Sequence, residues 1–284
     1  MKIKLAPTNS VRQMTSMLKG AFCLASATAI LGWVSPSQAQ IQVDTELSLL
    51  IDGSGSISSS DFTNQLSAYA NVFNNPDFFN DFSQSSLSQG GTGQFAVNLI
   101  QFSSGATEEL PFALIDSVAA SQAFASQISS ISQSVGVTNL AAGINLATST
   151  LLTNEFEGTT SMAIDISTDG FPSSPIAAAN AAANALNSGV DVINAIAVGS
   201  GANVAFLENQ IIGGTNASGE DAFVLAVGSF GDEFQDAIEE KIVGELAPPP
   251  KITPEPASTL GFALVGAGGA IAAWKRKRLS SSML

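Results

Sequence analysis

Apolar runs with the length of β-strands recur along the central part of the chain. They are LSLLI (47–51), FAVNLIQF (95–102), MAIDI (162–166), VINAIAV (192–198) and AFVLAV (222–227). Most are rich in Val and Ile and do not alternate with polar residues, which is typical of strands buried on both faces of a sheet. These runs predict a central sheet that is covered by helices on both sides.

Segments with helical periodicity lie between these runs. Apolar residues recur three or four positions apart over 62–73, 140–151 and 176–186, as on the buried face of an amphipathic helix. Alternating strands and helices predict a doubly wound α/β fold with a mostly parallel sheet. One connection differs, because EELPFALI (108–115) follows the second strand after only SSGAT, which is too short for a helical crossover. We therefore expect a hairpin and one antiparallel edge strand.

The segment between the first helix and the second strand is polar but contains several Phe residues. Its Asn-Pro pair is typical of a turn, so we expect residues 74–93 to form a loop insertion. Within it, Asp77 and Asp81 are expected to be solvated loop charges rather than ligands of a second cation.

Both ends of the chain have features of addressing signals. The N-terminal segment combines Lys and Arg residues with the apolar run AFCLASATAILGWV and the stretch SPSQAQ, which predicts a signal peptide over 1–39 that is cleaved after Ala39. Near the C-terminus, a Pro-rich linker (247–253) precedes Pro-Glu-Pro, an uncharged stretch at about 258–274 and the basic cluster KRKR. The uncharged stretch is near the lower limit of length for a helix that crosses a membrane, and the positive-inside rule places the main body outside the cytoplasm.

The C-terminal parts, residues 254–284, resemble the PEP-CTERM sorting signal of Gram-negative bacteria. This resemblance implies that an exosortase-type membrane protease cuts near Pro-Glu-Pro, so that the apolar helix is removed. A plain tail anchor is the alternative. The resemblance implies an exported protein that is transiently anchored in the inner membrane and then reaches the cell envelope, the cell surface or the extracellular matrix.

The segment between the two signals is strongly acidic. Residues 40–253 contain 23 of the 24 acidic residues and two basic ones, giving 2 − 23 = −21. Such a surface would repel phosphates and anionic membranes, so we expect neither nucleic acid nor membrane as a direct partner. The segment also has no His and no Cys, which excludes His- and Cys-dependent nucleophiles, disulfides and zinc bound by these residues. A metal site here must use oxygen ligands.

The stretch IDGSGSIS (51–58) lies between the first predicted strand and the first predicted helix. Ligands of open α/β sheets bind at this end of the strands, so the loop is a candidate site. A dinucleotide fingerprint is incomplete because Ser58 stands where the third glycine should be, a P-loop would need Gly-Lys-Ser/Thr, and a serine nucleophile would need a base. Taken alone, the loop is a flexible turn or part of a metal site.

Two further segments favour the metal site. The first loop provides D-x-S-x-S at Asp52, Ser54 and Ser56. GVTNLAAGI provides Thr138 as a candidate helix N-cap, and DISTDG provides Asp169 after a strand. Together and in this order, these segments resemble the metal-ion-dependent adhesion site of von Willebrand factor A (VWA) domains. Independently of the resemblance, carboxylates and hydroxyls are hard oxygen donors, which favour Mg²⁺, Ca²⁺ or Mn²⁺ over zinc or copper.

The resemblance to VWA domains extends over residues 44–246, and the stretches AIDISTDG and IIGG, the latter followed by AFVLAV, make it closest to a bacterial VWA-like branch of unassigned function. It implies that a partner's carboxylate completes the coordination of the ion. Asp165, in the middle of a strand, is expected to be a hydrogen-bonded structural acid rather than a residue behind the site.

We therefore expect an exported, non-enzymatic binding or adhesion module that depends on a divalent cation. Its ligand would be a protein that offers a carboxylate, or an extracellular polysaccharide. The alternative is an acidic structural protein of the matrix or cell surface, in which the metal only stabilises the fold. An enzyme that uses metal-bound water is disfavoured, because no spare acid–base group is identifiable beside the site.

Overall fold

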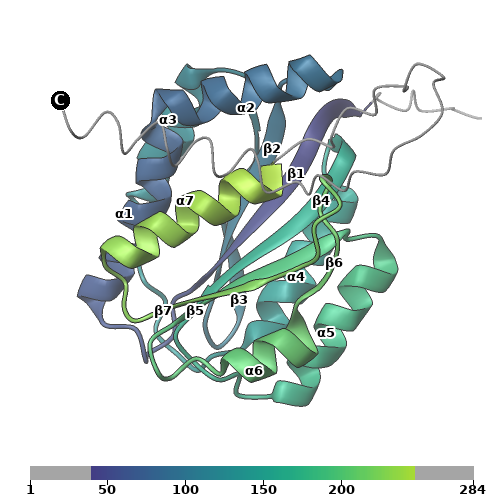
Figure 1. The fold of residues 1–284 in the computed structure, drawn as a ribbon. Coiled ribbons are helices and arrows are strands. Elements are labelled where there is room, and N and C mark those ends of the chain that lie inside the picture. Colours follow the sequence, from purple (N-terminus) through teal and green to yellow (C-terminus); the bar gives the residue numbers. More distant parts are fainter. Residues whose placement is uncertain (1–39, 247–284) are drawn as a thin grey trace, which may run out of the picture. The chain divides into compact units, whose positions relative to one another are not determined.

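The computed structural model describes residues 40–246, in which a seven-stranded sheet has helices on both faces (Figure 1). The strands are β1 (Ile41–Asp52), β2 (Phe95–Phe102), β3 (Ala106–Ile115), β4 (Phe156–Thr168), β5 (Val192–Val198), β6 (Gly213–Gly214) and β7 (Val224–Val227). The helices are α1 (Ser59–Asn74), α2 (Pro76–Gln89), α3 (Val118–Ile128), α4 (Leu140–Thr153), α5 (Pro175–Ser188), α6 (Val204–Phe206), the π-helical segment η1 (Leu207–Ile211) and α7 (Asp232–Leu246). The predicted signal peptide, linker and sorting signal, with the apolar stretch at 258–274, lie outside the described residues.

The predicted fold class is confirmed. The strand order is β3-β2-β1-β4-β5, and both β6 and β7 pair with β5. β1, β2, β4, β5 and β7 are parallel to one another, whereas β3 forms an antiparallel hairpin with β2 at one edge. The short antiparallel strand β6 was not predicted, because its two glycines provide no hydrophobic signal. None of the helices within residues 40–246 has the length and apolar character that a membrane crossing requires.

β1 begins earlier than its apolar run predicts. Asp44 and Glu46 interrupt the hydrophobic pattern, but both are buried within the strand. The Asp44 carboxylate accepts hydrogen bonds from the backbone N–H groups of Thr92 at 2.7 Å and Gly93 at 2.9 Å. The Glu46 carboxylate accepts one from the N–H of Gly158 at 2.7 Å. Because each buried acid has hydrogen-bond donors, its burial is tolerated and the strand continues through it.

The expected loop at 74–93 is wrong, because most of this segment forms helix α2. The Asn75 side chain caps the helix, Pro76 occupies its first turn, and Gly90 ends it with a φ of 92°, which are ordinary signals of helix ends. Its buried residues are three aromatic side chains and one serine: Phe78, Phe79, Phe82 and Ser86. The acids that were expected in the loop lie exposed on this helix instead: Asp77 and Asp81. The Asn-Pro pair therefore starts a helix and does not form a turn.

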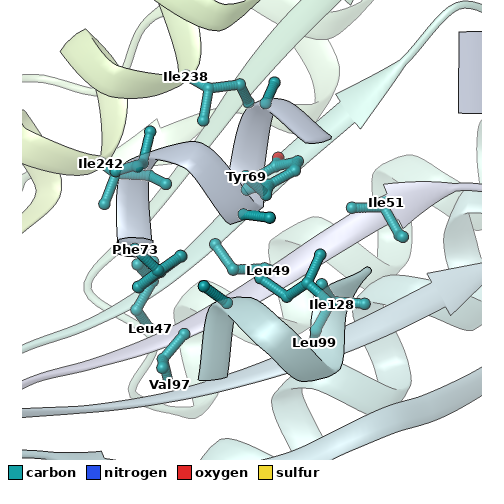
Figure 2. Close-up of a cluster of buried hydrophobic side chains, with 14 of the residues drawn as sticks. Leu47, Leu49, Ile51, Tyr69, Phe73, Val97, Leu99, Ile128, Ile238 and Ile242 are labelled. Atoms are coloured by element: carbon teal, nitrogen blue, oxygen red, sulfur yellow. The ribbon is translucent and has the colours of Figure 1, made fainter. Parts of the chain in front are cut away.

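Two hydrophobic cores lie on the two faces of the sheet. On one face, Leu47, Leu49 and Ile51 of β1 pack with side chains of α1, α3 and α7, as Figure 2 shows. On the other face, α4, α5 and η1 pack against a second cluster that includes Leu50. Successive side chains of a strand point to opposite faces, so β1 contributes to both cores. Its C-terminal end, Asp52, is therefore held in a fixed position.

A cluster of charged side chains is buried beneath α7. Lys241, the only basic residue within 40–246, is fully buried and forms an ion pair with Asp165 of β4. Its Nζ also lies 3.9 Å from Glu245 Oε1, which accepts a hydrogen bond from Asn194 at 2.9 Å. Burial, together with the nearby charge of Asp165, raises the pKa of Glu245 to about 8. Asp165 is thus the partner of Lys241, as expected for a structural acid.

The protonation of Glu245 should make stability depend on pH. In the unfolded chain this carboxyl ionises near its ordinary value of 4.5, whereas in the folded protein it keeps its proton up to about pH 8. The folded state therefore binds more protons in this window, and the unfolding free energy should fall as pH rises through it. Since one pKa unit corresponds to about 1.4 kcal/mol, the unfolding free energy of the wild type should fall by an amount on the order of a few kcal/mol over this window. Glu245→Gln has no carboxyl group to ionise at this position and should not show this decrease.

Urea denaturation between about pH 5 and about pH 8 measures this difference. Glu240→Gln is the matched control, because Glu240 is exposed on the same helix. Equal pH slopes for wild type and Glu245→Gln would contradict the assignment.

Candidate metal centre

The five predicted ligands meet at the edge of the sheet where the parallel strands end. Asp52 is the last residue of β1 and Asp169 directly follows β4, while Ser54 and Ser56 lie in the β1–α1 loop and Thr138 lies before α4. β1 and β4 are adjacent and parallel (Figure 1). The chain runs from β1 to β2 on one side and reaches β4 on the other, so this is the switch point of the sheet, where ligands of such folds bind.

The oxygen atoms of these side chains form a connected group. Ser54 Oγ lies 3.0 Å from Ser56 Oγ, and Thr138 Oγ1 donates a hydrogen bond to Ser54 Oγ at 3.1 Å. Ser56 Oγ donates to Asp169 Oδ1 at 2.6 Å. Neighbouring ligands of an octahedral Mg²⁺ ion, each about 2.1 Å from the metal, are about 3.0 Å apart. The hydroxyl spacing therefore fits a small divalent cation with oxygen ligands.

Asp52 is fully buried and its carboxylate accepts two hydrogen bonds. The N–H of Ser54 donates to its Oδ1 at 2.8 Å, and Thr168 Oγ1 donates to its Oδ2 at 2.6 Å. Burial nevertheless raises the pKa of Asp52 to about 6, and the charge of Asp169 contributes to this shift. Burial also raises the pKa of Asp169. Both carboxylates thus lack a compensating charge, and a bound cation would provide it.

The space beside the hydroxyls depends on Gly170. A Cβ atom at this position would lie 2.9 Å from Thr138 Oγ1 and 3.6 Å from Ser56 Oγ, so a side chain would crowd these oxygens. The expectation that Thr138 caps α4 is wrong, because the N-cap is Asn139, whose side chain accepts a hydrogen bond from the N–H of Ala142. The Thr138 hydroxyl is therefore available to the site.

Three supporting residues were not predicted as part of the site. Thr168 bonds Asp52, as described above. The side-chain amide of Gln133 donates to the carbonyl of Ile57 at 2.9 Å and more weakly to two other carbonyls of the same loop. Gln101 Oε1 accepts a hydrogen bond from the N–H of Ser134 at 2.6 Å. A Cβ on Gly53 would lie 2.1 Å from this oxygen, so only a glycine leaves room for the glutamine beside the loop. Thr168 belongs to the segment DISTDG, which also contains Asp169, so its position in the sequence could have indicated its role. No local sequence pattern indicates that Gln101 or Gln133 supports the site.

The donor set is limited to two carboxylates and three hydroxyls. Within residues 40–246, no group of three or more His, Cys, Asp or Glu side chains is placed to hold a metal ion. A cation at this edge would therefore be bound by Asp52, Ser54, Ser56, Thr138 and Asp169, with the rest of its coordination provided by water or by a ligand.

The sheet, its antiparallel edge and the polar loops at its C-terminal edge define the fold of a VWA domain. One similar structure is proximal thread matrix protein 1 (PTMP1) from the mussel byssus, whose metal-ion-dependent adhesion site (MIDAS) motif is occupied by zinc. It matches with a TM-score of 0.52 at 20% identity, over 73% of this chain and 46% of PTMP1. The VWA domain of SpRpn10 matches with a TM-score of 0.50 at 15% identity over 72% of this chain and 98% of that domain.

A pilus adhesin, SpaC from Lactobacillus rhamnosus GG, has the same fold over part of its length. The TM-score is 0.51 at 14% identity, over 73% of this chain and 31% of SpaC. The chain thus spans less than half the length of PTMP1 and about a third of SpaC. At these identities the likeness shows the fold alone.

The chain belongs to the family described as Protein of unknown function (DUF1194), which matches residues 42–250. A comparison with curated proteins gave no significant match.

The hydrogen bond from Thr168 to Asp52 should stabilise the ionised carboxylate. Thr168→Val removes the donor, and we expect a loss of about 1–3 kcal/mol of unfolding free energy in buffer with EDTA at about pH 7.5. The loss should be smaller at about pH 5, because Asp52, with a pKa of about 6, is then protonated in the folded state.

Urea denaturation at the two pH values tests this. Thr63→Val is the control, since the Thr63 hydroxyl lies exposed on α1 and bonds only the carbonyl of Ser59. A loss that does not change with pH, or one no larger than the control's, would rule out the proposed electrostatic role of Thr168.

Proposed function

We propose that this protein is a non-enzymatic binding module that holds a divalent cation, Mg²⁺ or else Ca²⁺ or Mn²⁺, and binds a carboxylate-bearing ligand through it. The observation that carries the proposal is the convergence of the Ser54, Ser56 and Thr138 hydroxyls at octahedral ligand spacing. Asp169 is hydrogen-bonded to Ser56, and the buried Asp52 accepts a hydrogen bond from the N–H of Ser54. These five residues would hold the ion. When bound, the ion would provide a positive charge with an open position for an anionic ligand.

The charge of the surrounding surface supports this role. Lys241 is the only basic residue within 40–246 and is fully buried. The surface of the described residues therefore offers acidic side chains without any basic one, and an acidic ligand would be repelled by it. A bound cation would provide the positive charge that the side chains of this surface lack. Binding would consequently depend on the metal.

Two of the similar structures support an adhesive role. One is a matrix protein whose MIDAS motif is occupied by zinc, and another is a pilus adhesin. For this chain we propose Mg²⁺ in place of zinc, because the site has no His or Cys and its hydroxyl and carboxylate oxygens are hard donors.

We also propose that the protein is exported and reaches the cell surface or the extracellular matrix. The signal peptide expected at 1–39 would direct export, and the PEP-CTERM-like segment at 254–284 would hold the chain in the inner membrane until an exosortase-type protease cuts it. Direct contact with a membrane would be limited to this segment before processing. Nucleic acid is not a proposed partner.

Binding of the cation should require Asp52. In calorimetry with Mg²⁺ and Mn²⁺, the protein should bind one ion, and Asp52→Ala should weaken binding by at least about tenfold because it removes one of two carboxylates. Asp77→Ala is the matched control, since Asp77 is exposed on α2, which does not carry the site. With the free ion at about 100 times its Kd, binding should also raise the unfolding free energy by about 2.7 kcal/mol. Equal binding by wild type and Asp52→Ala would refute the assignment.

A ligand-binding role can be separated from a purely structural one. If the protein is an acidic matrix protein whose ion only stabilises the fold, EDTA should lower the melting temperature without affecting any saturable binding. Under our proposal, extracellular partners captured with Mg²⁺ should be released by EDTA and should not be captured by Asp52→Ala. Capture that persists in EDTA and with Asp52→Ala would favour the structural alternative.

A further inference from the structure

The single basic residue within residues 40–246, Lys241, is fully buried beneath α7 although the surface around it is acidic. Its partner Asp165 is fully buried as well. Burying an ion pair seldom stabilises a protein, because the cost of removing two charges from water offsets their attraction. Apolar residues of similar volume often serve as well or better. The buried pair therefore indicates a role beyond that of an ordinary ion pair.

The fold holds the amine of Lys241 against the carboxyl group of Asp165. Lys241 Nζ contacts Asp165 Oδ1 directly and donates a hydrogen bond to the carbonyl of Ile166 at 3.3 Å. The two residues are 76 positions apart in the chain, so only the packing of α7 on the sheet brings them together. Holding a nucleophile beside the group it can attack removes much of the entropic cost of a reaction between them.

A second carboxyl group, that of Glu245, belongs to the same cluster. Its Oε1 lies 3.9 Å from Lys241 Nζ, one helical turn along α7. Burial first, and the charge of Asp165 second, raise the pKa of Glu245 to about 8, so this group carries a proton at neutral pH. Among the described residues, Asp165 Oδ2 and Glu245 Oε2 receive no hydrogen bond from a donor group. The proton of Glu245 would let the two carboxyl groups bond each other.

The surroundings of the three groups are apolar. Tyr69 of α1 and Ile238 and Ile242 of α7 belong to the hydrophobic core on this face of the sheet, as Figure 2 shows. The Tyr69 hydroxyl donates to Asp165 Oδ1 at 3.4 Å. Burial disfavours charged forms, so transfer of a proton from Lys241 to Asp165 would give a neutral amine beside a neutral carboxylic acid. A desolvated amine of this kind is a nucleophile.

We propose that Lys241 and Asp165 react to form an isopeptide bond, which joins α7 covalently to β4, and that Glu245 transfers the protons. Nζ of the neutral lysine attacks Cγ of the protonated Asp165 and forms a C–N bond. One C–O bond of that carboxyl group breaks, and its oxygen takes a proton from Glu245 and leaves as water. Glu245 then regains a proton from the nitrogen. An amine and a carboxylic acid thus become an amide and water, so no oxidant, reductant or cofactor is needed.

The place of this bond in the fold gives it a mechanical role. α7 is the last helix of the described residues, and residues 247–284 follow it in the chain. A pull on this following segment would therefore reach α7 first. β4 lies inside the sheet, between β1 and β5, so a covalent link from α7 to β4 would pass the pull to the sheet. This inference does not depend on the candidate metal centre.

Peptide mapping by mass spectrometry tests the proposal on protein expressed as the full 284-residue chain. After denaturation, a protease that cleaves after Glu places Asp165 in fragment 158–208 and Lys241 in fragment 241–245. We expect the two fragments to be joined, with a mass about 18 Da below their sum because one water molecule is lost. Tandem mass spectrometry should place the link on Lys241 and Asp165. Two separate fragments of full mass, without a linked species, would overturn the proposal.

Variants identify the reacting groups. Lys241→Arg keeps a positive charge beside Asp165 but has no amine to attack it, so its fragments should stay separate. Glu245→Gln removes the group that transfers protons and should lower the linked fraction at least about tenfold. Asp236→Asn is the matched control and should be linked like the wild type, because Asp236 is exposed on the same helix. Equal linkage in wild type and Glu245→Gln would overturn the role of Glu245.

The size of the denatured chain is a second measurement, which a buried ion pair would not affect. The bond closes residues 165–241 into a loop and so restricts the unfolded state. In denaturant, the wild type should therefore elute later from a sizing column than Lys241→Arg. Equal elution of the two denatured proteins would contradict the bond. The wild-type fragments decide the proposal even if a variant does not fold.

Discussion

The structure depends on a carboxylate that is buried at the end of its central strand. Asp52 ends β1, which contributes side chains to both hydrophobic cores, so its position cannot adjust without disturbing either one. Its oxygens are bonded by Thr168 of the adjacent strand and by the backbone of the Gly-Ser loop. The carboxylate thereby joins β1, β4 and the loop. The same burial disfavours its ionised form. A cation bound beside the carboxylate would offset this cost, because a nearby opposite charge favours ionisation.

The distribution of basic residues explains why the protein itself does not provide this positive charge. Lys241 pairs with Asp165 beneath α7, where removing either charge would leave the other buried and unpaired. Asp52 and Asp169 lie at the end of the sheet, and Lys241 is the only basic residue among those described. The two groups of buried charge are thus treated differently. One is neutralised inside the protein, whereas Asp52 and Asp169 have no basic partner among the described residues.

Much of this arrangement could be predicted from the sequence, because strands buried on both faces have continuous apolar runs and parallel strands bring their C-terminal ends together. Asp52 and Asp169 could be placed in this way, and the short link SSGAT predicted the antiparallel hairpin. Helix α2 could not, because an Asn-Pro pair is compatible with a turn as well as with a capped helix start. The early part of β1 was missed because Asp44 and Glu46 are satisfied by partners distant in sequence. Gln133 and Gln101 act across loops, where sequence spacing gives no information on proximity.

Two exposed valines show a related limit of sequence patterns. Val135 and Val137 occur in the polar segment SQSVGVTNL and suggest neither a strand nor a helix. Only the meeting of separate loops brings them beside the metal centre. Because they are exposed, they contribute little to the hydrophobic cores and can change without loss of the fold. The candidate ligands are constrained differently, because Asp52 ends a strand that packs in two cores. The Thr138 and Ser56 hydroxyls need the space that Gly170 leaves open. The fold therefore constrains the residues of the candidate metal centre more tightly than the exposed residues beside it.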